Sequence, residues 1–196
     1  MGKGAETRER ILDQAVRLAS RDGLEGLTIG TLSSELGLSK SGLFAHFGSK
    51  DELQLQVLQA AVERFEQNVI RPALAAPRGE PRLRALMEHW LTWEDNPDMP
   101  GGCLIVAASV EFDDRPGPLR DYLVHSHQRR YDFIVKAARI AIEAGHFRPD
   151  LDTDQFAFDV NAVLLGYHYA HRMLRDRKAR EHARANFERL LADSRI

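Results

Sequence analysis

Apolar residues recur along this chain at the i, i+3, i+4, i+7 spacing of a buried helix stripe, from one end to the other. We find no convincing alternation of apolar and polar residues of the kind that marks a strand, no internal repeat and no low-complexity segment. Elements with this pattern bury their stripes by packing helix against helix. We therefore predict an all-α protein of about nine helices.

Glycine and proline residues divide the chain into these helices. The first helix is expected to begin near Thr7 and to end at Gly23. Three prolines and one glycine between Arg71 and Pro81 predict a break. The other helices are expected at about 28–36, 39–46, 49–65, 82–95, 103–112, 118–144, 153–175 and 179–193.

Charge and composition exclude several classes of protein. The 27 Lys and Arg residues nearly balance the 29 Asp and Glu residues, which excludes a histone-like polycation but not a local DNA-binding face. The single cysteine, Cys103, can form no intramolecular disulfide, which fits a reducing compartment. The longest apolar run, Cys103 to Val110, is too short to cross a bilayer, and the chain does not start with a secretory signal. We therefore expect a cytoplasmic protein that does not enter a membrane.

Residues 28–53 contain the segment that points most directly to a function. Its two short helices are joined by a tight turn, where Gly37 can supply a positive φ and Ser39 can cap the second helix. This arrangement predicts a helix-turn-helix, whose second helix, Ser39–Phe47, would enter the major groove of DNA.

The exposed positions of this second helix suit contact with DNA. Lys40, Ser41 and Gly42 occupy its first turn, where base edges and phosphates would be met. A glycine here lowers helix propensity by roughly 1 kcal/mol relative to alanine, which makes sense if a side chain would collide with DNA. Farther along lie Phe44, His46 and Lys50, the last of them beside a free helix N-terminus that can bind an anion.

The same segment resembles the DNA-binding domain of the TetR family of bacterial transcriptional regulators. The family pattern of apolar, glycine, serine, histidine and lysine positions is matched by Thr28, Ile29, Leu32, Gly37, Leu38, Ser39, Leu43, His46, Phe47, Ser49, Lys50 and Leu53.

The resemblance implies a set of DNA contacts. Ser33 stands where the family usually has alanine. Phe44 stands where it usually has tyrosine, so the phosphate hydrogen bond of that hydroxyl is missing. The resemblance and the exposed positions of the second helix together predict the DNA-binding residues. They are Thr28, Ser39, Lys40, Ser41, Gly42, Phe44, His46 and Lys50.

The resemblance also implies the organisation of the whole chain. Residues 1–50 would form a three-helix helix-turn-helix domain, and residues 51–196 a larger helical domain for effector binding and dimerisation. The expected function is that of a ligand-responsive repressor, which binds a palindromic operator in double-stranded DNA as a homodimer. An unidentified small apolar effector would release it.

Two faces of one helix predict the dimer interface. The helix at 153–175 has one semi-apolar side that suits its own core and a second that suits a partner. The predicted interface residues are Asn161, Leu165 and Tyr169 from this helix and Phe187 from the last one.

A surplus of aromatic residues between positions 82 and 144 predicts an effector pocket. Not all of them can lie on the single stripe that each helix needs for its core, so we expect some to border a cavity for a mostly uncharged molecule. The predicted pocket residues are Met87, Trp90, Trp93, Cys103, Phe112, Tyr122, His125 and Ser126.

Other interpretations are weaker but remain open. The chain could be a helical adaptor that does not bind DNA, or an all-helical carrier or enzyme, although it lacks phosphate-loop, metalloprotease and nucleophile-elbow motifs. Each aromatic residue alone could be core packing, and Cys103 a small buried hydrophobe instead of a redox sensor. The histidines do not have the spacing of a metal site. We predict no enzyme activity, cofactor or metal.

Overall fold

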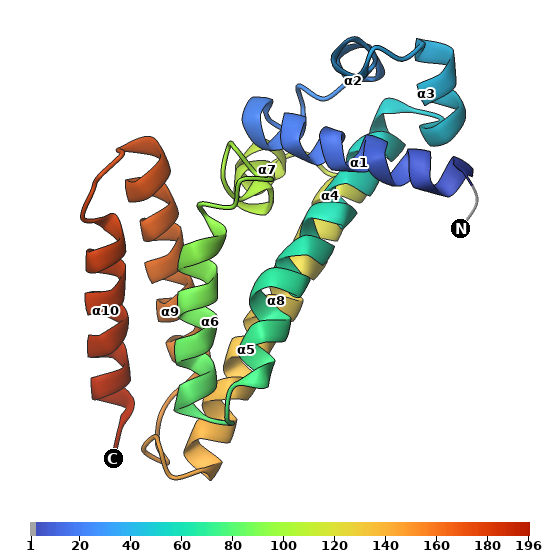
Figure 1. Ribbon diagram of the computed structural model, residues 1–196. Helices are drawn as coiled ribbons and strands as arrows, with labels where there is room; N and C mark the ends of the chain where they lie inside the picture. The colour runs from blue at the N-terminus through green and yellow to red at the C-terminus, as the bar shows by residue number, and fades with distance from the viewer. Residues whose placement is uncertain (1–2) are drawn as a thin grey trace. The chain divides into compact units, whose positions relative to one another are not determined.

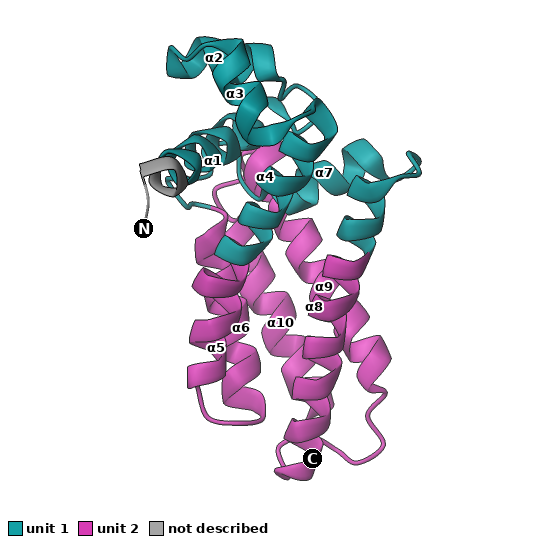
Figure 2. Ribbon diagram, turned by 90° about the vertical axis from the view of Figure 1, so that its right-hand side faces the viewer, with its two compact units in different colours: residues 1–64, 95–124 teal, residues 65–94, 125–196 magenta. Residues whose placement is uncertain are grey.

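The computed structural model describes residues 3–196, with side chains from Thr7 onward. The chain divides into two compact units, Met1–Arg64 with Asp95–Val124 and Phe65–Glu94 with His125–Ile196 (Figure 2). Regular structure in the described residues is helical, apart from one isolated bridge between Phe147 and Arg195. None of the described helices is both long and apolar enough to span a membrane.

Unit 1 contains the N-terminal helices of the chain (Figure 1). The core lies where helix stripes meet, with Ala15, Leu32 and Leu43 fully buried. The elements are α1 (Lys3–Asp22), α2 (Ile29–Leu36), α3 (Lys40–Phe47), nearly all of α4 (Lys50–Phe65), α7 (Leu104–Phe112) and the start of α8 (Pro118–Glu143).

A glycine lets the loop before α7 dock on α1. The Ser20 hydroxyl donates to the Gly102 carbonyl at 2.9 Å, and the Gly101 N–H donates to Ser20 Oγ at 3.0 Å. A Cβ at Gly101 would lie 1.5 Å from the Ser20 carbonyl oxygen, so no other residue fits this approach.

Unit 2 is built around an aromatic cluster. The ring of Phe65 meets the rings of Trp90 and Trp93 edge-on, with centroids 4.8 and 5.7 Å apart. Edge-to-face packing of this kind adds to the stabilisation from burial alone. The elements are the π-helix η1 (Glu66–Ile70), α5 (Arg71–Ala75), α6 (Glu80–Trp93), the rest of α8, α9 (Thr153–His168), the π-helix η2 (Tyr169–Met173) and α10 (Ala179–Ser194).

The number of helices agrees with the prediction, but two boundaries do not. The first helix was expected to begin near Thr7, and α1 begins one turn earlier, at Lys3. When α4–η1–α5 and α9–η2 each count as one continuous helix, the described residues form nine. The break expected between Arg71 and Pro81 begins only at Ala76, because helical structure continues through η1 into α5. Pro72 lies in the first turn of α5, where a missing N–H is tolerated.

The first turn of α6 is tied to the end of α10 by ion pairs. Glu80, whose side chain is only 14% exposed, contacts Arg84 at 2.8 Å and Arg195 at 2.6 Å. Arg84 also pairs with Glu188. Hydrogen bonds from Arg195 and then Arg84 lower the pKa of Glu80 from 4.5 to about 2. The folded chain therefore favours the ionised carboxylate.

We expect Glu80→Gln to change how stability depends on pH. Since folding lowers the pKa, the stabilisation is complete above pH 4.5 and is lost as the pH falls towards 2. Near neutral pH the substitution should lower the free energy of unfolding by about 1–2 kcal/mol, less than the full shift because both arginines are partly exposed. Urea unfolding followed by circular dichroism between about pH 7 and about pH 3 measures this change, because the loss of stabilisation begins below pH 4.5.

Glu181→Gln is the matched control, because Glu181 is exposed on α10 and has no ion pair among the described residues. The difference in stability between Glu80→Gln and the wild type should shrink at the acidic end. A difference that stays constant with pH would contradict the role given to Glu80.

Candidate functional site

Side-chain caps and a left-handed glycine hold α2 and α3 together. The Thr28 hydroxyl accepts from the Thr31 N–H, and the Thr31 hydroxyl accepts from the Thr28 N–H, which closes a reciprocal capping box. Gly37 ends α2 with φ +62°, a conformation that favours glycine. The turn predicted from the sequence is therefore present, and α2 packs on α3.

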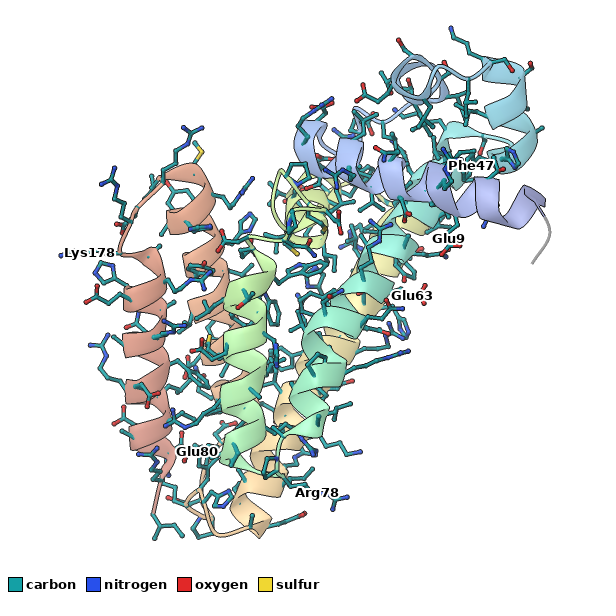
Figure 3. The ribbon with its side chains drawn as sticks, viewed as in Figure 1. Glu9, Phe47, Glu63, Arg78, Glu80 and Lys178 are labelled. Atoms are coloured by element: carbon teal, nitrogen blue, oxygen red, sulfur yellow. The ribbon has the colours of Figure 1, made fainter. Side chains whose placement is uncertain are left out.

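A single cap positions the first turn of α3. The Ser39 hydroxyl accepts from the Gly42 N–H at 3.1 Å. On the inner side of the helix Leu43 and Phe47 are buried, and Phe47, labelled in Figure 3, lies beneath the guanidinium of Arg8 at 5.8 Å. One side of α3 is thus fixed to the core of unit 1.

The opposite side of α3 is exposed, as predicted. Lys40, Ser41 and Gly42 are exposed, and Phe44 is 58% exposed, an unusual position for a large apolar ring. His46 is half-buried. The helix has no acidic residue. The result is a short, neutral-to-basic surface with one aromatic ring.

Gly42 has a structural neighbour that the sequence did not indicate. A Cβ at this position would lie 3.1 Å from Ser39 Oγ, the cap oxygen of the same helix, and would meet no other described residue within 4 Å apart from its chain neighbours and the backbone of its own helix. A side chain here would crowd the cap while its outer part pointed into open space. The glycine therefore protects the cap and also keeps the exposed surface flat.

Lys50 makes an ion pair that sequence analysis missed. Its ammonium lies 3.1 Å from the carboxylate of Glu25, which is also 3.4 Å from Arg115. The Glu25 N–H in turn donates to Glu111 at 2.9 Å. These partners are far apart in sequence and follow no periodic pattern. The ammonium of Lys50, which was predicted to contact a phosphate, is therefore already paired with a carboxylate of the protein.

The remaining predicted DNA contacts have roles within the protein as well. Thr28 is half-buried, and its hydroxyl serves the α2 cap. The Ser39 hydroxyl serves the α3 cap. Both residues fix the helix ends from which neighbouring groups would reach DNA.

The predicted dimer residues divide into exposed and buried. Leu165 is 42% and Tyr169 57% exposed, and Asn161 is half-buried. Phe187 is only 3% exposed, because it packs inside unit 2. Further exposed apolar side chains are Phe158 on α9 and Met173 on η2.

The predicted pocket residues divide between the two units. Cys103 and Phe112 are buried in unit 1, where Tyr122 is half-buried. In unit 2, His125 is exposed, and the buried residues are Met87, Trp90, Trp93 and Ser126. The two indole rings are engaged in the cluster with Phe65, so core packing accounts for part of the aromatic surplus.

Three buried polar atoms of unit 2 have no hydrogen-bond partner among the described residues, and two of them belong to adjacent residues of the chain. These two are the indole Nε1 of Trp93 and Oε1 of Glu94, whose other oxygen contacts His168 at 2.9 Å. Buried donors and acceptors are nearly always paired in native proteins. Each of these two atoms could therefore form a hydrogen bond with water or a ligand.

A buried arginine, Arg130, lies over the aromatic rings of Phe65 and Trp90 and contacts His127. The guanidinium of Arg130, a buried residue, lies 4.8 Å from the centroid of Trp90. Burial, and then the charge of Arg130, lower the pKa of His127 to about 4. His127 is therefore neutral near pH 7. No three metal-ligating side chains come together in the described residues.

Comparisons with known proteins agree with this geometry. Residues 11–57 match the family model "Bacterial regulatory proteins, tetR family". Residues 79–187, more than half of the chain, match the model "Tetracyclin repressor-like, C-terminal domain". The two matches cover the helix-turn-helix and most of the later helices.

Among curated relatives, the nicotine-responsive transcriptional repressor HdnoR of Paenarthrobacter nicotinovorans is 31% identical over 81 residues. This match covers 41% of the chain and 40% of HdnoR. The chain spans less than half the length of the curated relatives it matches.

Solved structures match over nearly the full length. A TetR transcriptional regulator from Chloroflexus aurantiacus is 28% identical with a TM-score of 0.88, covering 98% of this chain and 96% of that one. A protein of Saccharomonospora viridis described as a transcriptional regulator and solved with choline is 26% identical, with a TM-score of 0.72 and coverage of 94% and 96%. The chain belongs to the TetR family of bacterial transcriptional regulators.

Proposed function

We propose that this chain is a ligand-responsive repressor that binds a palindromic operator as a homodimer. The observation that carries the proposal is the capped helix α3, which buries one side and leaves Lys40, Ser41 and Phe44 exposed on the other. TetR-family members are DNA-binding regulators and not enzymes. Binding to operator DNA would place the protein in the cytoplasm.

The proposed contacts fall into two kinds. Residues in the first turn of α3, above all Lys40 and Ser41, would meet base edges and fix the sequence preference. Lys50 at the start of α4 would meet a phosphate and contribute affinity for any sequence. Its pairing with Glu25 would have to loosen when DNA binds.

The exposed apolar residues of α9 support a dimer. Leu165 and Tyr169 are separated by one helical turn, and Phe158 lies two turns before Leu165, so the three share one face. An apolar stripe on the outside of a helix that also packs on α10 suits a partner chain. A two-fold dimer would read two half-sites in successive major grooves.

The effector proposal concerns unit 2. An uncharged molecule near Trp93 could accept from its indole N–H or donate to Glu94 Oε1, two buried atoms that lack partners among the described residues. A response to small molecules is supported by two similar proteins, because HdnoR is described as nicotine-responsive and the Saccharomonospora viridis protein was solved in complex with choline. Differential affinity for two states of the dimer would couple the effector to DNA.

Selection from a random duplex library tests the proposed function as a whole. A dimer of this kind should enrich a palindrome whose half-sites are centred about 10 base pairs apart, or a multiple of that. A chain that retains no duplex even at low salt would fit the adaptor interpretation and contradict DNA binding.

We expect Lys50→Ala and Glu25→Gln to shift DNA affinity in opposite directions. The loss of Lys50 removes one phosphate contact, so the slope of log affinity against log salt should fall by about one unit. The loss of the Glu25 carboxylate frees Lys50, and binding should tighten roughly 1.5- to 5-fold, the range of an exposed ion pair. Fluorescence anisotropy with a labelled duplex of arbitrary sequence measures both.

Lys178→Ala is the matched control, since Lys178 is an exposed cation of unit 2. It should leave the salt slope unchanged. If Lys50→Ala has the slope of the wild type, the proposed position of α4 on DNA is wrong.

Leu165→Asp combined with Tyr169→Asp should convert the dimer to monomers. Two carboxylates in the centre of an apolar interface would be desolvated without a partner. Sedimentation velocity at micromolar concentration measures the mass. Val110→Asp, on α7 and 74% exposed, should stay dimeric. A wild-type chain that sediments as a monomer would contradict the proposed dimer.

A further inference from the structure

Unit 2 contains a groove of about 530 Å³ between α5, the loop before α6 and the second half of α8. This volume lies within the range of small-molecule sites. The apolar part of the groove consists of Leu74, Phe133, Ala137 and Ile140. The last three lie at i, i+4 and i+7 on one face of α8, so they form a continuous strip. Leu74 is 46% exposed, which leaves apolar surface open to a ligand.

Positive charge surrounds this strip. Arg78, Arg82, Lys136 and Arg139 line the groove, and the lining includes one carboxylate, Glu143. Arg78, labelled in Figure 3, lies in the loop that leads into α6. The lining residues therefore have three more positive than negative charges.

These cations are not neutralised within the protein. None of the four makes an ion pair with a carboxylate in the part of the chain that the structure describes. Three other arginines of unit 2 do pair with carboxylates, Arg84 with Glu188, Arg184 with Glu88 and Arg129 with Glu66. The groove therefore gathers four cations around one apolar strip, with Glu143 as the one acid in its lining.

Arg82, which lines the groove, is held in place by the backbone of the neighbouring helix end. One of its terminal nitrogens, Nη2, donates to the carbonyls of Leu74 and Ala76, both at 3.1 Å, which holds the side chain in place. Its Nε is buried and has no hydrogen-bond partner. A donor that is removed from water and left unpaired is costly unless a ligand accepts from it.

From these observations we infer that the groove binds an amphipathic carboxylate, an organic anion with an apolar tail. The carboxylate would accept from Arg82 and lie near Arg78 and Lys136, because arginine donors match carboxylate geometry. The tail would cover the strip on α8. This ligand differs from the uncharged effector expected near Trp93, and its binding does not require the proposed function, since no DNA takes part.

Three probes separate the parts of this inference. Octanoate has both head and tail, 1-octanol has the tail alone, and acetate has the head alone. In isothermal titration calorimetry on the full chain, in phosphate-free buffer, octanoate should bind at one site per chain. Octanol and acetate should each bind at least about tenfold more weakly, because each lacks one of the two contributions. Equal affinity for octanoate and octanol would overturn the role of charge, and equal affinity for octanoate and acetate would overturn the role of the tail.

Variants locate the site. Arg78→Ala combined with Lys136→Ala removes two exposed cations that have no hydrogen bond among the described contacts, so folding should be unaffected. Octanoate binding should weaken at least about tenfold. The control, Arg177→Ala with Lys178→Ala, removes the same charge from exposed positions away from the groove lining. Equal losses in both double variants, or no saturable binding to the wild type, would overturn the proposal.

Discussion

Two hydroxyl caps hold the helices on which the proposed DNA contact depends. Helices α2 and α3 have eight residues each, and isolated helices shorter than about 12–15 residues are marginal in water. The Thr28 and Ser39 hydroxyls satisfy N–H groups that the helices cannot pair themselves. Each cap contributes about 1 kcal/mol. Because the Ser39 cap bonds to Gly42, the group that stabilises α3 also determines which residue can stand on its exposed first turn.

Local rules therefore predicted unit 1 well. Caps and glycines act within four residues, and both helices of the turn begin and end where such residues stand. The same rules failed after Ile70, where proline content predicted a break and the helix continued through a π turn. The difference is physical: Pro72 lies just after the π-helical segment Glu66–Ile70, where the hydrogen-bond pattern of the helix changes, and α5 packs on α6.

Contacts between distant residues explain the rest of the difference between sequence and structure. The aromatic surplus was visible in the sequence. The sequence could not show that Phe65 would pack against the indole rings of both Trp90 and Trp93, or that Phe133 would line a groove. The spacing of residues along the chain also could not show that Lys50 would form an ion pair with Glu25. Such pairings depend on the order in which helices pack, and periodicity within one helix carries no information about that order.

The cations of the groove differ from the arginines of unit 2 that form ion pairs between helices. Glu80 joins the start of α6 to Arg195 at the chain's end, and Arg84 extends the network to Glu188, so most charges there contribute to holding helices together. The cations of the groove have no carboxylate partner among the described residues, and like charges around one hollow repel each other. Stability alone would favour a carboxylate or an apolar residue at these positions. An anion that enters the groove supplies the missing charge, which is why the same feature that weakens the free protein is an argument for a ligand.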